Sequence, residues 1–229
     1  MIPLIPLIAI DGPAGAGKSS VARRLAERLG FALVDTGGIY RAVALAAARR
    51  GITWTDDAGL ALLLSTWRIE QRDGGLSIDG EDVSEAIRAP EISRGASTVS
   101  ARPVVRDGLL ELQRSLALQA KRGAVLEGRD IGTVVFPDAA VKFFVTASPE
   151  KRATRRYAEL SSKGVTISYE SVLADQIQRD REDSERAIAP LKPAPDAVIV
   201  DTTALTLEQV VNRLERVARD KLMGGVGDS

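Results

Sequence analysis

The chain has 229 residues, a length typical of one domain or of one core with substantial insertions. Its 45% hydrophobic and 27% charged residues allow a sizeable core, and the balance of 31 acidic against 31 basic residues argues against a protein dominated by attraction to nucleic acid or a membrane surface. Cysteine and histidine are both absent, which excludes disulfides, thiol nucleophiles, imidazole bases and the usual zinc sites.

Whatever chemistry occurs must therefore use carboxylates, lysine, arginine, hydroxyls, backbone amides or a metal ion. Arginine outnumbers lysine by 24 to 7. This excess either reflects codon usage or indicates that guanidinium groups bind phosphates, and composition alone leaves both explanations open.

The first ten residues are apolar but do not have the pattern of a signal peptide, because they contain two prolines and no basic segment. They are also far shorter than the roughly 20 apolar residues that a membrane span needs, and no other segment is long enough. We therefore expect a cytoplasmic protein. Residues 7–10 have the composition of a buried parallel strand.

Strands and helices alternate through the next forty residues. Apolar residues at helical spacing predict a helix over 21–29, which Gly30 ends. A second short strand is predicted at 31–34, followed by a helix from Ile39 to about Arg50. This alternation predicts a parallel sheet covered by helices.

The middle of the chain has a different pattern. Residues 67–71 and 76–79 flank Asp73-Gly74-Gly75, which is typical of a hairpin. Weak helices near 56–66 and 84–100 border this small antiparallel patch, so we interpret it as an insertion. Pro103 then begins a helix with an apolar face.

The parallel pattern resumes with strands at 124–126 and 141–147 and a fifth strand at 198–200. Ser148 is the predicted N-cap of a basic helix, and a further helix covers about 168–184. Thr206 and Gln209 match a capping box ahead of a last amphipathic helix, and the tail at 224–229 is expected to fray. We find no linker between independent domains.

The segment Gly12-Pro-Ala-Gly-Ala-Gly-Lys18-Ser19 has the full spacing of a P-loop and lies between a predicted strand and helix. Its glycines allow backbone N–H groups to point at phosphates beside a helix N-terminus. Lys18 is expected to reach the β- and γ-phosphates, and the Ser19 hydroxyl to bind Mg²⁺. The alternative, a purely structural glycine turn, does not account for the strand and helix on either side.

A P-loop alone does not specify a function. A guanine-reading Asn-Lys-x-Asp motif is absent, since the only asparagine is Asn212, and the nearest candidate for a motor-type acidic residue, Glu127, is followed by Gly-Arg-Asp. Small-molecule phosphoryl transfer is the best remaining class.

Two further segments could bind a second phosphate: residues 35–41, at a predicted strand end, and the arginine-rich run 179–186. Such a run is more often a solvated helix face with salt bridges.

Four segments carry a resemblance to a known family: residues 12–20, 35–41, 127–138 and 186–190. In this order and spacing they closely resemble the bacterial cytidylate kinases of the nucleoside monophosphate kinase family, with similarity over about residues 7–220. The resemblance implies an α/β P-loop kinase fold, in which helices cover both faces of a five-stranded parallel sheet. It also implies a single domain over 1–229 that includes a monophosphate-binding region at 36–110, with a small antiparallel sheet, and a short lid at 179–190.

The resemblance also implies roles for individual residues. The ATP phosphates would be bound by Gly12, Pro13, Ala14, Gly15, Ala16, Gly17, Lys18, Ser19 and Ser20, with Ser19 also as the metal ligand. CMP would be bound by Thr36 and Arg41 at its phosphate, by Ser97, Arg106 and Asp130 at the cytosine, by Arg129 and Arg179 at the phosphates, and by Asp183 and Arg186 at the sugar. The catalytic set would be Lys18, Arg129, Arg179, Asp183 and Arg186, and Arg181 is a weaker match in the lid. Thr36 and Gly38 stand where Ser and Ala are common in the family, and Thr36 keeps the hydroxyl.

The implied function is phosphorylation of CMP, and of dCMP, by ATP with Mg²⁺, through direct in-line transfer without a covalent enzyme intermediate. A phosphomonoester has a second pKa of about 6, so the acceptor is already dianionic and needs no histidine base. The partners would be these small nucleotides, with no nucleic acid or membrane, and the protein would be a monomer. The open alternatives are a kinase for UMP or a small non-nucleotide acceptor, and a P-loop module that hydrolyses ATP slowly and signals by conformation. For Asp130 the alternative to base reading is a pair with a neighbouring arginine such as Arg129.

Overall fold

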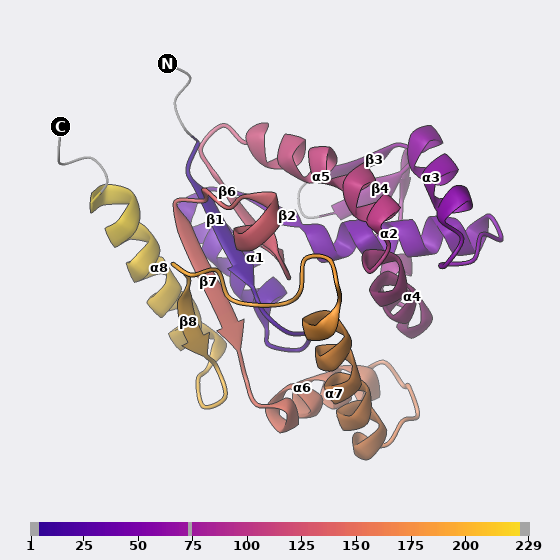
Figure 1. Cartoon of the computed structure of the whole chain (residues 1–229). Coiled ribbons are helices and arrows are strands. Elements are labelled where there is room, and N and C mark those ends of the chain that lie inside the picture. The colour runs from indigo at the N-terminus through magenta and orange to yellow at the C-terminus, as the bar shows by residue number, and fades with distance from the viewer. Residues whose placement is uncertain (1–4, 73–74, 225–229) are drawn as a thin grey trace.

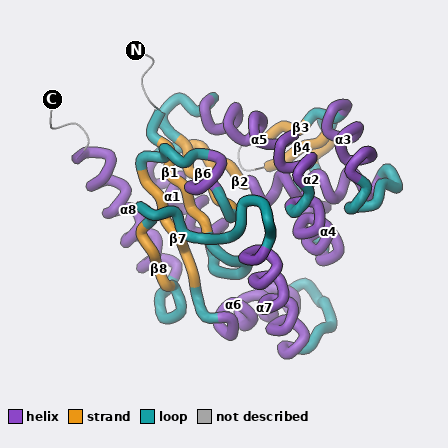
Figure 2. Tube along the Cα trace, in the orientation of Figure 1, coloured by secondary structure: helices purple, strands orange, loops and turns teal. Residues whose placement is uncertain are grey.

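The computed structural model describes residues 5–72 and 75–224, which form two sheets and the helices around them (Figures 1 and 2). The larger sheet is parallel throughout and has the strand order β2-β6-β1-β7-β8. Its strands are β1 (Leu7–Asp11), β2 (Ala32–Asp35), β6 (Ala124–Gly128), β7 (Val141–Thr146) and β8 (Val198–Asp201). The predicted five-stranded parallel sheet is therefore confirmed.

Helices cover both faces of this sheet, and the alternation of side chains along β1 shows how. Ile8 and Ile10 lie in a core with α1 (Lys18–Leu29) and α8 (Leu207–Gly224), whereas Leu7 and Ala9 face the opposite core. That second core is closed by the C-terminal part of α5 (Pro103–Leu118) and by η2 (Ile131–Val135), a single π-helical turn. Successive strand residues point to opposite faces, so a strand covered on both sides is apolar throughout.

The insertion has a core of its own, arranged around α2 (Thr36–Arg49) on the right of Figure 1. It contains α3 (Asp57–Thr66), the antiparallel sheet β3-β4-β5 (Ile69–Arg72, Gly75–Ile78, Glu81–Asp82), the 3₁₀ turn η1 (Ala86–Arg88) and α4 (Pro90–Ser100). The Trp54 indole donates a hydrogen bond to the Ala44 carbonyl (3.0 Å) and packs on Gly95, where a Cβ atom would lie 2.4 Å from the ring. The small sheet predicted for this region is confirmed, with a third strand that the sequence analysis did not include.

Several predicted boundaries were wrong, and α1, for example, begins at Lys18 rather than at residue 21. Helix α2 begins at Thr36 rather than Ile39, because the Asp35 carboxylate accepts a hydrogen bond from the Gly38 amide (2.7 Å) and caps the helix. The helix predicted at 84–100 is divided into η1 and α4, because Pro90 begins a new helix. Strand β6 continues to Gly128, beyond the predicted end at residue 126. The hairpin turn at 73–74 and the tail at 225–229 lie outside the described residues.

The remaining helices, α6 (Pro149–Ser162) and α7 (Tyr169–Glu185), pack against each other below the sheet in Figure 1. The predicted N-cap of α6 is confirmed, since the Ser148 hydroxyl accepts a hydrogen bond from the Lys151 amide (3.2 Å). The capping box of α8 is confirmed as well, with reciprocal hydrogen bonds between Thr206 and Gln209. Among the residues described, no helix combines the length and apolar character needed to cross a membrane.

Candidate active site

The P-loop joins β1 to α1, and its glycines occupy backbone positions that other residues would strain. Gly12, Gly15 and Gly17 have φ values of 146°, 74° and 90°. A Cβ atom on Gly12 would lie 1.9 Å from the backbone oxygen of Val145, so the loop can pass β7 only with glycine at this position. This geometry agrees with the predicted phosphate-binding loop.

Two arginines of α6 support the loop from behind. Arg152 donates hydrogen bonds to the carbonyls of Ala14 (3.1 Å) and Ala147 (2.9 Å) and also pairs with Asp180 on α7. Arg155 donates to the Ala16 carbonyl at 3.2 Å. The carbonyl groups of Ala14 and Ala16 are thus bonded to α6, and these two hydrogen bonds fix the conformation of the loop.

Lys18 is buried at the start of α1, and its ammonium donates a hydrogen bond to the Pro13 carbonyl (2.8 Å). Burial and the nearby charge of Arg129 together lower the pKa of Lys18 to about 7, although the charges of Glu127 and Asp183 oppose this shift. A buried cation that its carboxylate neighbours do not fully compensate is suited to bind an anion.

The C-terminal end of β6 places Glu127 beside the P-loop. Its carboxylate is buried and accepts a hydrogen bond from the Ser19 hydroxyl; burial raises the pKa of Glu127, and the nearby Asp35 charge adds to the effect. The Thr36 hydroxyl donates to the Glu127 backbone oxygen at 2.6 Å, which holds the start of α2 against this strand. Arg41 pairs with Asp35 at 2.9 Å, and its buried Nε has no hydrogen-bond partner among the described residues.

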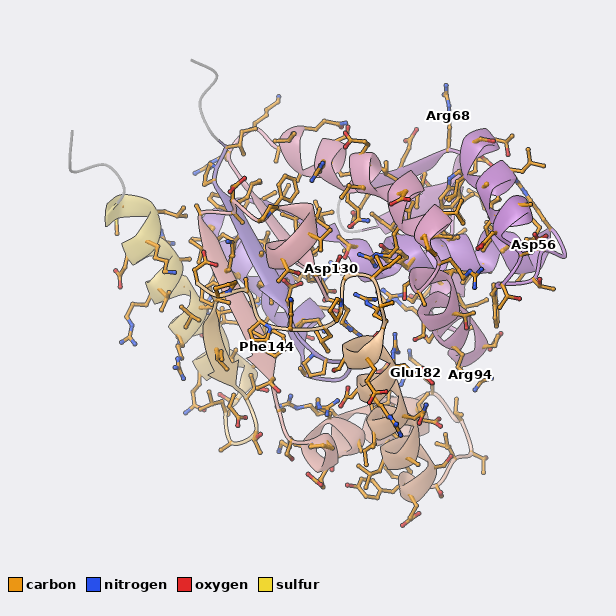
Figure 3. All side chains as sticks on the ribbon, viewed as in Figure 1. Asp56, Arg68, Arg94, Asp130, Phe144 and Glu182 are labelled. Carbon is orange, nitrogen blue, oxygen red and sulfur yellow. The ribbon has the colours of Figure 1, made fainter. Side chains whose placement is uncertain are left out.

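Asp130 lies where the parallel sheet, the insertion and the end of α7 meet (Figure 3). Its carboxylate pairs with Arg106 of α5, and Arg186, at the C-terminal end of α7, approaches it to 3.7 Å. The three side chains are only 6%, 7% and 8% exposed, respectively. The Arg106 guanidinium also lies over the Tyr40 ring, 5.9 Å from its centroid.

A pair between Asp130 and Arg129, the alternative considered from the sequence, is not formed. Arg129 instead pairs with Asp183 on α7, with Nε 2.8 Å from the carboxylate. Burial would raise the pKa of Asp183, but the charges of Arg129, Arg179 and Arg186 lower it. Asp130 and Asp183 are therefore each held by arginines from a different part of the fold.

The predicted lid contains arginines of two kinds. Arg181 is exposed and pairs with Glu185 one turn along α7 (3.1 Å), as expected of a solvated helix face. Arg179 differs, because its buried Nε has no hydrogen-bond partner in the part of the chain that the structure describes, and because burial lowers its pKa to about 10. Arg186 donates from Nε to the Ala189 carbonyl (2.5 Å), while its buried Nη2 has no hydrogen-bond partner within residues 5–72 and 75–224. The interpretation as a solvated helix face thus holds for Arg181 and not for Arg179 and Arg186, whose guanidinium groups are partly buried.

Ser97 is the predicted site residue that is not joined to the others. It is half-buried on α4, and its backbone carbonyl accepts a hydrogen bond from the Ser100 hydroxyl (2.9 Å). Arg106 donates to the Ser100 carbonyl at 3.3 Å, so the first turn of α5 approaches the end of α4 through Ser100.

Sequence reasoning missed three buried polar residues at the site, Asp11, Tyr40 and Gln113, and considered a fourth, Glu127, only as a motor-type acidic residue. Tyr40 forms a hydrogen bond with Gln113 and lies near Arg106, Asp130 and Arg186, and burial raises its pKa. Tyr40 and Glu127 belong to segments already quoted for the resemblance, but Gln113 carries no local signal on its helix.

The arrangement gathers cations around one place. Lys18, Arg129, Arg179 and Arg41 lie close enough for their charges to act on one another, and they come from α1, the loop after β6, α7 and α2. Such a set can hold and neutralise phosphate groups. Beside it, Asp130 and Arg106 form a polar pair that can read the edge of a ligand.

Comparison with known proteins adds the family. The sequence model of the family described as cytidylate kinase matches residues 8–220. The cytidylate kinase of Geobacter sp. (strain M21) is 53% identical over 223 residues, which cover 96% of this chain and 95% of the relative. The cytidylate kinase of Geobacter sulfurreducens is 51% identical over 219 residues, covering 94% and 93%. An uncharacterized protein from Eubacterium ventriosum has a similar fold, with a TM-score of 0.53 and 12% identity over 93% of this chain and 98% of that one.

Proposed function

The chain belongs to the cytidylate kinase family, and on that basis we propose that it transfers the γ-phosphoryl group of ATP to the phosphate of CMP. The observation that carries this proposal is the group of half-buried arginines around the buried Lys18, next to the pair of Asp130 and Arg106. A phosphate site and a base-reading pair side by side are what a nucleotide acceptor requires.

The donor phosphates would lie in the P-loop, against the backbone amides of residues 12–20 and the Lys18 ammonium. The oxygen donors here also fit Mg²⁺, which in proteins keeps several waters and binds through one or two protein oxygens and substrate phosphates. The Ser19 hydroxyl would contact the ion, and the Glu127 carboxylate, hydrogen-bonded to Ser19, would orient it. The bound ion would neutralise charge between the donor phosphates.

The acceptor would be positioned from three sides. Thr36 and Arg41 would hold the CMP phosphate, and no described residue provides a hydrogen-bond partner for the buried Nε of Arg41. Arg129 and Arg179 would neutralise the phosphates, and Asp183, which pairs with Arg129, would contact the sugar together with Arg186. Because the acceptor phosphate is a dianion near neutral pH, the protein needs to align two anions and balance their charge, and no general base is required.

The base would be recognised through its exocyclic group. Cytosine presents an amino donor where uracil presents an oxygen acceptor, and a carboxylate accepts from the first but repels the second. Asp130, oriented by Arg106, is the proposed reader, and Ser97 is proposed as a further contact on the family pattern alone.

The same proposal includes several finer points. dCMP would be a second acceptor, since it shares the base and phosphate and lacks only the 2′-hydroxyl. The region 36–110 would bind the monophosphate, and residues 179–190 would close over both nucleotides and exclude water. The protein would act as a monomer, because large exposed apolar side chains such as Leu62, Leu118 and Ile199 come from different elements.

One assay tests the proposal. ADP production from ATP and Mg²⁺ is measured with CMP, dCMP, UMP, AMP or no acceptor, and K18A serves as the inactive control. Dependence on CMP supports the proposal, whereas preference for UMP or AMP would indicate a related kinase. Equal turnover without any acceptor would indicate an ATP-hydrolysing module instead.

A further inference from the structure

Asp11 is a buried carboxylate that the proposed mechanism does not use. It is the last residue of β1, directly before the P-loop, and only 3% of its surface is exposed. Its two oxygens accept hydrogen bonds from two consecutive backbone amides, Oδ1 from Ile131 and Oδ2 from Gly132, both at 2.8 Å. No substrate phosphate is needed to explain these bonds, because both donors belong to the protein.

The two amides belong to the turn that presents the proposed base reader. Ile131 and Gly132 are the first residues of η2, and Asp130 immediately precedes them with φ −146° and ψ 24°. The first amides of a helical turn lack partners within the turn, and a carboxylate from elsewhere can satisfy them. Asp11 therefore caps η2 and fixes the backbone on which Asp130 stands.

Strand pairing explains why this anchor is rigid. Asp11 is aligned with Gly128 of β6, two residues before Asp130, and with Phe144 of β7 on its other side. Gly132 also packs against the stem of Lys142, since a Cβ atom there would lie 3.1 Å from its Cδ. A charge-assisted pair of bonds thus links the strand that carries the P-loop to the turn that carries Asp130.

We propose that Asp11 is a positioning residue for base selection, which holds Asp130 in the orientation that distinguishes cytosine from uracil. The inference rests on the proposed function, because it concerns the same acceptor site. It assigns Asp11 no contact with either nucleotide. Its effect is expected in the choice of acceptor rather than in the affinity for ATP.

The decisive variant is D11N. Asparagine keeps the shape of the side chain, but only one of its two terminal atoms is an acceptor. Its amide oxygen replaces one carboxylate oxygen, and its NH₂ group faces the other backbone N–H donor. We expect kcat/KM for CMP to fall about tenfold or more, as for loss of one charge-assisted hydrogen bond, while kcat/KM for UMP falls less and KM for ATP stays near the parent value. A thermal melt establishes that the variant is folded.

D201N is the matched control. Asp201 is also the last residue of a parallel strand and also accepts a hydrogen bond from a backbone amide, that of Thr203 (2.8 Å), but it is exposed and belongs to β8. Its CMP:UMP ratio should equal that of the parent. If D11N lowers kcat/KM for CMP and for UMP by the same factor, or mainly raises KM for ATP, Asp11 only supports the fold or the P-loop and the inference is overturned.

A second measurement is the pH dependence of the CMP:UMP ratio in the parent protein. Burial and the nearby charge of Asp130 raise the pKa of Asp11 to about 6, although the hydrogen bonds from the Gly132 and Ile131 amides and the charge of Lys18 act to lower it. Arg129 and Lys142 also lie nearby. Protonation below this pH converts one acceptor oxygen into a hydroxyl, so the CMP:UMP ratio of the parent should decrease between about pH 8 and pH 5. The titration of the acceptor phosphate is common to both nucleotides and cancels in the ratio.

D11N should lack this part of the pH profile. An unchanged profile in D11N, or a flat profile in the parent, would overturn the inference. These outcomes differ from failure of the proposed function, in which the parent itself would show no ADP production that depends on CMP or UMP.

Discussion

The pair between Asp130 and Arg106 allows stability and base selection to be separated by mutation. In D130A the Arg106 and Arg186 guanidinium groups lose their common counter-ion, although their side chains are only 7% and 8% exposed. Removing one partner of a buried ion pair costs about 3–5 kcal/mol. For a chain of this length, where 1 kcal/mol corresponds to about 2–4 °C, the melting temperature should fall by about 6–20 °C.

The kinetic effect should be separate from this loss. kcat/KM for CMP should fall about 10²-fold or more in D130A, and the value for UMP much less, because a site built to bind one polar edge discriminates strongly only while its own group is present. Steady-state kinetics with both acceptors, at a temperature well below the melting point of the variant, measure the ratio.

The double variant D130A/R106M distinguishes the two effects. Removing both charges leaves no uncompensated Arg106, so much of the melting temperature should return, while the CMP preference should stay lost. An unchanged melting temperature in D130A would refute the buried pair. A CMP preference that returns together with stability in the double variant would refute base reading by Asp130.

Three further predictions concern the phosphate site. K18A should lower kcat by about 10²–10³ or more without a lower melting temperature. Because the pKa of Lys18 is lowered to about 7, the affinity of the parent for ATP, measured by titration calorimetry, should weaken as the pH rises above about 7. The affinity of K18R should not show this pH dependence, because arginine stays charged. R179A and R186A should each lower kcat/KM for CMP. R181A, the exposed control, should leave kcat/KM unchanged and should change the free energy of unfolding by no more than about 0.5 kcal/mol. Equal behaviour of all three variants would contradict the assignment of Arg179 and Arg186 to the acceptor site. G12A should lose ATP binding in the same titration because its Cβ atom would lie 1.9 Å from a backbone oxygen of β7, and normal binding would show that the loop has another conformation.

The parts of the fold that were predictable depend on short-range patterns. The P-loop, the buried strands and the caps at Ser148 and Thr206 are each determined by residues within a few positions of one another. The start of α2 was missed because Gly37 and Gly38 suggest a turn, whereas the cap from Asp35 makes them the first turn of the helix. The end of β6 was missed because Gly128 is a weak strand former in isolation.

The parts of the site that were not predictable depend on long-range contacts. Arg106 and Asp130 are 24 positions apart, and Asp11 and Ile131 are 120 apart. The resemblance supplied most of the site residues but not their partners, so Asp130 was compared with Arg129, its neighbour in sequence. Burial in three dimensions, which decides the protonation of Lys18 and Asp11, leaves no pattern along the chain.

Helix α5 belongs to two cores at once, and this gives it the mechanics of a lever. Leu109 packs in the core of the insertion and Ala117 in the core beneath the parallel sheet. From Ala117 to Arg106 is about 16 Å at the rise of an α-helix. A tilt of about 10° around the Ala117 end would displace Arg106 by about 3 Å, as far as a hydrogen bond reaches. The ion pair of Arg106 with Asp130 therefore requires that the two cores keep a nearly constant angle to each other.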